Sequence, residues 1–360
     1  MTDSSDQPSA PWQDALLADR YRLKARVGSG SMAQVFRAVD EGTGESVAVK
    51  ILRPELVGEQ ALIDAFVSEA RLGATVSHPN VIDVRHVGAL PDGTHYLVTE
   101  LCEGQTLEQL LEAEGALPLP LIYDLAAQIC AGLSAAHTKG VIHRDLKPEN
   151  ILLPPREDGS HGCKLLDFGL AKLPTPQTVS KPGVFVGTPR YASPEQAMNE
   201  PLDMRTDIYS LGIVLYEMAA GRPPFDAPGF VDILKQHLHE PPDEIGPARN
   251  AAGLEPIPDL LEALIMRCLE KQPADRHVTV RRVATDLDAI RAGILDRVSA
   301  ELLQESSPRM VRARLASQPS FPPPPALPEV APVKDRSTFK LLLALALLIA
   351  GIAIGCWTFL

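Results

Sequence analysis

Residues 141–170 read VIHRDLKPENILLPPREDGSHGCKLLDFGL, and this stretch decides the fold and most of the chemistry of the chain. It contains four functional side chains in a fixed order over a short span: Asp145, Lys147, Asn150 and Asp167. Transfer of the γ-phosphoryl group of ATP needs a carboxylate to orient the attacking hydroxyl, a cation beside the moving group, and oxygen ligands for Mg²⁺. The four residues supply one group of each kind and a second metal ligand.

A second set of motifs, upstream of this stretch, fits nucleotide binding. Residues 27–35 read VGSGSMAQV between two predicted strands, where glycines let backbone N–H groups approach phosphate oxygens without a Cβ in the way. A strand rather than a helix follows this turn, which excludes a dinucleotide-binding βαβ unit. The sequence VAVK at 47–50 then places Lys50 on the next strand, and Glu69 lies in the helical pattern of Gln60–Val76.

Together these motifs resemble the protein kinases, in particular bacterial membrane-associated serine/threonine kinases. The resemblance covers about residues 21–291 and implies an α+β, bilobal protein-kinase fold. We therefore expect a kinase domain at 21–295, with a β-rich N-lobe that contains one long helix (about 21–101) and a mainly helical C-lobe (about 105–295).

The resemblance also implies a role for each residue of the candidate site. Asp145 would accept the proton of the substrate hydroxyl, and Lys147 would stabilise the transferring γ-phosphoryl group. Lys50 would hold the α- and β-phosphates, with Glu69 as its ion-pair partner. Asn150 and Asp167 would bind Mg²⁺, with Mn²⁺ as the alternative ion. The residues expected to bind ATP are Val27, Gly28, Ser29, Gly30, Ser31, Met32, Ala33, Gln34, Val35, Ala48, Lys50, Glu69, Thr99 at the gatekeeper position, and Glu100 and Cys102 at the hinge.

Residues 187–195 read GTPRYASPE and resemble the end of the activation segment of serine/threonine kinases. The resemblance implies that Glu195 pairs with Arg276 and that Asp207 braces the backbone of the catalytic loop. Arg144, directly before the catalytic aspartate, implies a kinase that is held inactive until a phosphate in the activation segment neutralises this arginine. The candidate acceptors of that phosphate are Thr175, Thr178 and Ser180.

One position departs from the family pattern. Kinases commonly place an apolar spine residue four positions after the helical glutamate, where this chain has Gly73, whereas Val84, His143 and Phe168 fill the other spine positions. Because glycine inside a helix costs ~1 kcal/mol relative to alanine, we hypothesise that this helix stays inactive until something orders it.

Composition restricts the partners of the chain. A formal net charge of −12 argues against nucleic acid, since the phosphate backbone rewards basic surfaces. The five cysteines are odd in number and form no CxxC pair, which fits a reducing compartment better than a disulfide framework or a zinc site. Residues 1–20 are expected to form a flexible lead-in without a signal peptide, and the polar stretch 154–163 a hairpin insertion without chemistry.

The C-terminal part of the sequence predicts a membrane anchor. Residues 296–340 form a basic, proline-rich juxtamembrane linker with four consecutive prolines at 322–325. Residues 341–360 read LLLALALLIAGIAIGCWTFL, an uncharged run as long as the ~20 residues that span a bilayer. A buried core helix is the alternative interpretation. Because basic residues precede the run, the positive-inside rule predicts an anchor in the cell inner membrane with the kinase domain in the cytoplasm.

We therefore predict an ATP-dependent serine/threonine kinase of protein substrates that phosphorylates itself through a transient homodimer. A pseudokinase scaffold that binds partners without turnover is the alternative, but it would be expected to lack Lys50, Asp145 or Asp167. A small-molecule phosphotransferase is disfavoured because it would not need the peptide-docking GTPRYASPE segment.

Overall fold

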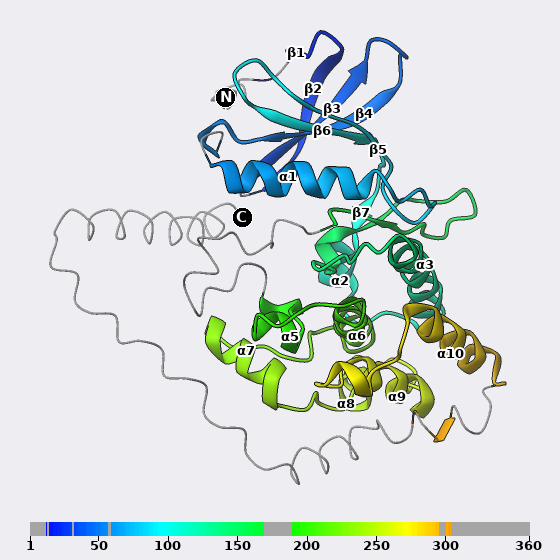
Figure 1. Ribbon diagram of the computed structural model, residues 1–360. Coiled ribbons are helices and arrows are strands. Elements are labelled where there is room, and N and C mark those ends of the chain that lie inside the picture. Colours follow the sequence, from blue (N-terminus) through cyan, green and yellow to red (C-terminus); the bar gives the residue numbers. More distant parts are fainter. Residues whose placement is uncertain are drawn as a thin grey trace, which may run out of the picture. The chain divides into compact units, whose positions relative to one another are not determined.

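A six-stranded antiparallel sheet forms the N-terminal part of the domain in the computed structural model (Figure 1). The structure describes residues 12, 14–30, 32–56, 59–168, 189–294, 300, 301 and 303. The strand order is β1-β2-β3-β4-β6-β5. The strands are β1 (Leu16–Leu17), β2 (Tyr21–Ser29), β3 (Ala33–Asp40), β4 (Ser46–Leu52), β5 (Val84–Ala89) and β6 (His95–Glu100).

The alternation of apolar residues in these strands divides the sheet into two packed faces. One face buries Tyr21, Phe36, Val49 and their neighbours in a cluster of its own. On the other face, helix α1 (Gln60–Gly73) packs Phe66 against Leu97 of β6 and its surroundings. Figure 1 shows α1 lying along the sheet on the side that faces the helical part of the domain.

The rest of the domain is mainly helical and is built around one large apolar core. A short three-stranded sheet of order β7-β8-β9 connects it to the first sheet. The elements of this helical part are β7 (Gln105–Thr106), α2 (Leu107–Glu114), α3 (Leu119–Thr138), β8 (Ile151–Leu153), β9 (Lys164–Leu165), α5 (Pro194–Ala197), α6 (Arg205–Ala220), α7 (Phe230–His239), α8 (Gly246–Ala251), α9 (Asp259–Cys268) and α10 (Val280–Ala292). It also contains 3₁₀ turns at Pro148–Asn150, Pro189–Tyr191 and Pro273–Asp275, and the N-terminal part contains one at Pro54–Leu56.

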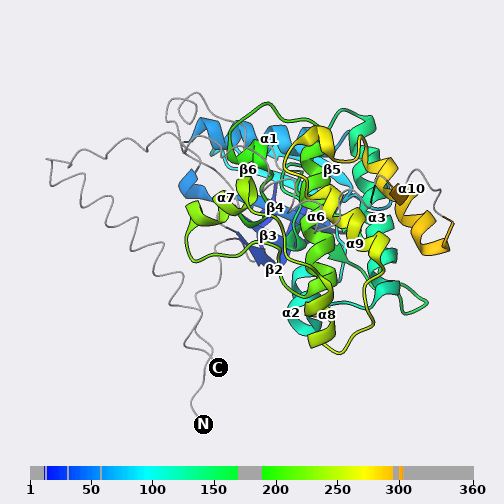
Figure 2. The same ribbon diagram turned by 90° about the horizontal axis from the view of Figure 1, so that it is seen from below.

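Helices α3 and α6 form the centre of this core. Helix α6 packs against α3 and α9, and α3 also packs against α10 (Figure 2). Within the part of the chain that the structure describes, α3 is the one helix long and apolar enough to cross a membrane, and most of it is buried in this core. The predicted span at 341–360 lies outside the described residues.

Two elements end at other residues than the sequence pattern predicts. Strand β2 continues through Gly28 to Ser29, because Gly28 and Ser29 pair with Val35 and Gln34 of β3. Helix α1 ends at Gly73 instead of continuing to Val76. The insertion at 154–163 forms the predicted hairpin, closed by a bridge between Pro155 and His161.

Candidate active site

The glycine-rich motif forms the hairpin between β2 and β3. The backbone N–H of Gly30 donates to the carbonyl of Ala33 at 2.9 Å, which closes the tip. From the end of β4, Arg53 donates through Nε to the carbonyl of Gly30 and through a second nitrogen to Oγ of Ser29, both at 2.9 Å. The sequence did not predict this contact. Ser31 at the tip lies outside the described residues.

Lys50 projects from β4 on the face of the sheet opposite to Val49 and Ile51. The strand register places it beside Val35 of β3 and Leu97 of β6. Its Nζ forms an ion pair with Oδ1 of Asp167 at 2.8 Å, with the lysine side chain 21% exposed. The lysine predicted to hold the nucleotide and the aspartate predicted to bind the metal therefore meet in space.

Helix α1 carries Glu69, the predicted partner of Lys50. Its side chain lies outside the described residues, so this pairing stays a prediction.

The hinge is held by the side chain of Glu100. Its Oε1 accepts the backbone N–H of Asp83 at 2.9 Å and Nζ of Lys164 at 2.5 Å. The carboxylate is therefore committed to Asp83 and Lys164. The backbone N–H of Glu100 is also occupied, because it donates to the carbonyl of Asp83 at 2.9 Å, so the carbonyl of Glu100 and the backbone of Cys102 remain the groups predicted to read an adenine edge. Burial raises the pKa of the Cys102 thiol, and the charge of Glu100 raises it further.

The catalytic loop brings Asp145, Lys147 and Asn150 together. Nζ of Lys147 lies 3.5 Å from Oδ2 of Asp145. Nδ2 of Asn150 donates to the backbone carbonyl of Asp145 at 2.8 Å and to its Oδ2 at 3.1 Å. The carboxylate of Asp145 is thus held between the ammonium of Lys147 and the amide of Asn150. A carboxylate that is fixed in this way can align a hydroxyl nucleophile.

A hard divalent cation fits the residues that follow. The backbone N–H of Leu166 donates to the carbonyl of Asn150 at 2.9 Å, which connects the loop to the segment that carries Asp167. The described residues contain no group of three or more His, Cys, Asp or Glu side chains arranged to hold a metal. Mg²⁺ commonly takes one or two protein ligands and completes its shell with phosphates and water, so Asn150 and Asp167 suit Mg²⁺ bound with ATP.

Asp207, at the start of α6, fixes the backbone of the catalytic loop through hydrogen bonds. Its Oδ2 accepts the backbone N–H of His143 at 2.8 Å, and its Oδ1 accepts that of Arg144 at 2.8 Å. Oδ2 also lies 2.7 Å from Nε2 of His137, a residue of α3 that the sequence did not single out. Arg144 has a positive φ of 65°, a conformation that costs a non-glycine residue of order 1–3 kcal/mol and that these contacts hold in place.

Two of the predicted spine residues, His143 and Phe168, lie in contact. The rings of His143 and Phe168 lie 4.6 Å apart, and Nε2 of His143 lies 2.9 Å from the carbonyl of Leu166. A Cβ on Gly73 would lie 3.2 Å from Cγ2 of Val84, so Val84 occupies part of the space of a larger side chain. Because α1 ends at Gly73, the full cost of a glycine inside a helix does not apply, and this weakens our hypothesis that the helix stays inactive until something orders it.

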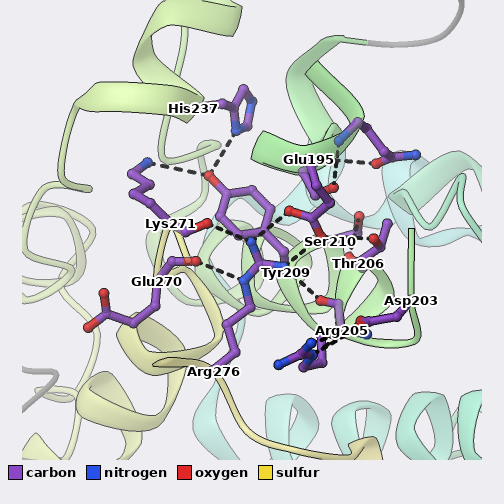
Figure 3. Close-up of polar contacts among 12 residues, drawn as sticks. Glu195, Asp203, Arg205, Thr206, Tyr209, Ser210, His237, Glu270, Lys271 and Arg276 are labelled. Carbon is purple, nitrogen blue, oxygen red and sulfur yellow. Dashed lines mark hydrogen bonds and ion pairs between the residues drawn. The ribbon is translucent and has the colours of Figure 1, made fainter. Parts of the chain in front are cut away.

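The predicted ion pair of the helical part is present and almost fully buried. Arg276 donates through two nitrogens to the two carboxylate oxygens of Glu195 at 2.7 and 2.8 Å, with side-chain exposures of 0% and 4% (Figure 3). Burial alone would raise the pKa of Glu195, but the hydrogen bonds and charge of Arg276 outweigh it, and the pKa lies below its usual value. Thr206 donates a further hydrogen bond to this carboxylate at 2.8 Å.

The predicted regulatory hydroxyls Thr175, Thr178 and Ser180 lie outside the described residues, which resume at Pro189. Arg144, their predicted partner, has a buried Nε atom without a hydrogen-bond partner among the described residues. The contacts that sequence reasoning missed come from Arg53, His137 and Lys164. None of these lies in a motif, and only the fold brings them to the site.

Comparison with known proteins agrees with this geometry. The protein kinase domain model matches residues 21–286 of the chain. The chain belongs to the protein kinase family. Serine/threonine-protein kinase pkn3 of Myxococcus xanthus is 37% identical over 279 residues, which cover 76% of this chain and 50% of that protein. Serine/threonine-protein kinase PknA of Mycobacterium tuberculosis is 36% identical over 288 residues, covering 79% of this chain and 64% of that protein.

This kinase therefore belongs to the bacterial serine/threonine type, as the sequence predicts. The chain spans 50%, 40% and 39% of the length of the first three curated relatives that it matches. Among solved structures, the PknI kinase domain of Mycobacterium tuberculosis matches with a TM-score of 0.59 and 23% identity over 77% of this chain and 98% of that one. This likeness confirms the bilobal kinase fold, with its β-rich N-lobe and helical C-lobe.

Proposed function

We propose that this chain is an active Mg·ATP-dependent serine/threonine protein kinase held at the cytoplasmic face of the cell inner membrane. The observation that carries the catalytic part is the convergence of Lys50, Asp145, Lys147, Asn150 and Asp167. A pseudokinase scaffold would not need to keep all five.

Each of these residues has a separate role in phosphoryl transfer. Asp145 orients the substrate hydroxyl and takes up its proton, while Lys147 stabilises the charge on the moving phosphoryl group. Lys50, held by Asp167 in this structure, is placed to hold the α- and β-phosphates. Asn150 and Asp167 would hold Mg²⁺ bound with ATP, and the ion would neutralise the charge on the phosphates.

Two further parts of the proposal concern the regulation of the kinase and its location in the cell. Nε of Arg144 is buried and has no hydrogen-bond partner among the described residues, which supports capture of a phosphate that the kinase adds to Thr175, Thr178 or Ser180 through a transient homodimer. The apolar run at 341–360 and the basic residues before it support a C-terminal anchor.

Transfer from γ-labelled ATP to the full-length chain and to a generic protein substrate tests the activity. Asp145→Asn should lower the rate at least ~10²-fold, because the positioned base is lost. Lys50→Met should lower it comparably, because a phosphate clamp is lost. The exposed Asp158→Asn, in the hairpin insertion, and Lys139→Met serve as matched controls that retain the rate. Near-wild-type transfer by Asp145→Asn, or dominant phosphotyrosine among the products, would refute the assignment.

Replacing Thr175, Thr178 and Ser180 together by alanine tests the regulation. We expect lower activity toward an added substrate, and restored activity in the triple variant that also carries Arg144→Ala. Unchanged activity of the alanine variant would show that the chain is active without a phosphate in this segment.

A further inference from the structure

Three consecutive residues directly before Asp167 each contact a different part of the domain. They are Lys164, Leu165 and Leu166, and we call them the β9 segment because β9 covers the first two. Lys164 contacts the hinge, Leu165 contacts the loop between α1 and β5, and Leu166 contacts the catalytic loop. The position of Asp167 therefore depends on three parts of the domain at once.

The contact with the hinge is a partly buried ion pair. Nζ of Lys164 lies 2.5 Å from Oε1 of Glu100, and the two side chains are 18% and 22% exposed. Glu100 is the last residue of β6 in the six-stranded sheet, whereas Lys164 belongs to the small sheet of the helical part. An ion pair that is shielded from water is screened less than a surface pair, so its loss has a larger effect.

The loop between α1 and β5 closes these contacts into a ring. The backbone N–H of Leu165 donates to the carbonyl of Asn80 at 2.9 Å, and the carbonyl of Leu165 accepts the N–H of Ile82 at 3.0 Å. The next residue is Asp83, whose N–H donates to Oε1 of Glu100 at 2.9 Å. One carboxylate therefore holds the hinge, this loop and β9 together, and the ring is closed by its ion pair with the lysine.

The end of the β9 segment fixes a strained residue. Asp167 adopts a positive φ of 42°, a conformation that costs a non-glycine residue of order 1–3 kcal/mol and persists only where its surroundings hold it. Directly before it, the N–H of Leu166 donates to the carbonyl of Asn150, and Nε2 of His143 lies 2.9 Å from the carbonyl of Leu166. The orientation of the Asp167 carboxylate is thus set by how the β9 segment is held.

The ring joins the two ends of the nucleotide site. The carbonyl of Glu100 is predicted to read adenine, and Asp167, the third residue after Lys164, is predicted to bind Mg²⁺. A base that fixes the hinge also fixes the lysine and the segment that carries Asp167. Resting on the ATP-dependent activity proposed above, we propose that Glu100 and Lys164 are positioning residues whose ion pair couples adenine binding at the hinge to Mg²⁺ binding at Asp167. By linkage, each event then strengthens the other by the same factor.

Calorimetric titration of the full-length chain in detergent tests this coupling. Adenosine, which has no phosphate, reports on the hinge without metal, and Lys164→Met should weaken its binding ~three- to tenfold. The β,γ-imido analogue of ATP reports on the metal. The factor by which Mg²⁺ strengthens its binding should fall at least ~threefold in the same variant. A merely structural role would lower the fraction of chain that binds, but it would leave both dissociation constants unchanged.

Further variants separate the ion pair from other effects of the substitution. Lys164→Arg keeps the cation and should stay close to the wild type in both measurements. Glu100→Gln keeps an oxygen that can accept the Asp83 N–H but loses the charge, so it should resemble Lys164→Met. The double variant Lys164→Met/Glu100→Gln should lose no more than either single variant. Lys235→Met, which breaks an exposed lysine–carboxylate pair on α7, is the matched control and should bind as the wild type does.

These measurements need no turnover, so they separate this proposal from the kinase assignment. The expected losses in a chain that binds nucleotide but transfers no phosphate would still support the coupling. Wild-type dissociation constants in Lys164→Met, or single losses that add in the double variant, would overturn it. A loss of adenosine affinity with an unchanged effect of Mg²⁺ would also overturn it, because the hinge would then act independently of Asp167. A wild-type chain that binds neither ligand would overturn it together with the kinase assignment.

Discussion

Several residues that decide whether this kinase works never approach the reacting atoms. Asp207 accepts the backbone N–H groups of His143 and Arg144 and thereby sets the position of Asp145, the next residue along the chain. The ion pair between Arg276 and Glu195 likewise fixes the position of the segment that ends the activation loop. Such residues act through geometry, so their removal is expected to affect stability as much as rate.

Arg276→Met should lower the free energy of unfolding by about 3–5 kcal/mol, because it leaves the carboxylate of Glu195 buried and unpaired. Urea unfolding followed by circular dichroism measures the effect. Lys235→Met, which breaks an exposed pair with Asp232, is the control and should cost no more than ~1 kcal/mol. The double variant Arg276→Met/Glu195→Gln should lose less than the sum of the single losses; strict additivity would show that the two side chains are not coupled.

A buried hydrogen-bond chain next to this pair makes stability depend on pH. Nε2 of His237 lies 3.1 Å from the carbonyl of Arg190, so it must donate there, and Nδ1 then accepts the Tyr209 hydroxyl at 3.0 Å (Figure 3). Lys271 donates to the same hydroxyl at 3.4 Å. Burial, together with the charge of Lys271, lowers the pKa of His237 to about 3.

We expect His237 to reduce stability as the pH falls. Below pH 6.5, the ordinary pKa of histidine, His237 is protonated in the unfolded chain but stays neutral in the folded protein. The free energy of unfolding is therefore highest above pH 6.5 and declines as the pH falls toward 3. His237→Gln keeps one donor and one acceptor but does not titrate. Between pH 6.5 and 5 its unfolding free energy should fall less steeply than that of the wild type, by up to about 1.4 kcal/mol per pH unit. Parallel pH profiles of the two proteins would contradict this assignment.

At the scale of the elements, helix α6 shows how packing overrides local propensity. Nearly all of α6 is buried, and Gly212 lies in its middle, where alanine would form a better helix. A Cβ at this position would lie 2.7 Å from Cβ of Cys268 on α9. The two helices can approach this closely only because Gly212 has no side chain.

Gly212→Ala should therefore destabilise the protein by about 1–3 kcal/mol, in spite of the helix propensity of alanine, because the contact with α9 becomes overpacked. Thermal unfolding measures the change. Gly246→Ala, at the start of α8 where an added Cβ meets nothing within 4 Å, is the matched control and should shift the unfolding free energy by no more than ~0.5 kcal/mol. A gain in stability in Gly212→Ala would show that α6 and α9 can separate without cost.

At the scale of the whole molecule, the sequence after residue 340 predicts how the kinase domain is held in the cell. We expect the full-length chain to sediment with membranes and to resist high salt and alkali, because Leu341–Leu360 contains no charged residue and the leucines and isoleucines each favour insertion by ~0.3–0.6 kcal/mol at the bilayer centre. Detergent should release it. A chain truncated after Val333 should stay in the supernatant and keep its kinase activity. Release of the full-length chain by alkali would refute the anchor.

The sequence by itself determined the family and the fold, and it predicts the set of catalytic residues. Asp145, Lys147 and Asn150 lie within six residues, and local backbone geometry brings them together once the loop forms. The sequence predicts the strands β3, β4 and β6 and the helix α1, because alternating and helical apolar patterns are local properties of the chain. The same locality explains why the hairpin at 154–163 was predicted.

Only the tertiary structure decided which distant side chains share an environment. The pairing of Lys50 with Asp167 and the contact of His137 with Asp207 join elements that are separated by tens of residues. No local pattern encodes these contacts, because they follow from how the helices pack on α6 and how the two sheets are connected. The physical reason is that chemistry depends on distance in space, whereas a motif records only distance along the chain.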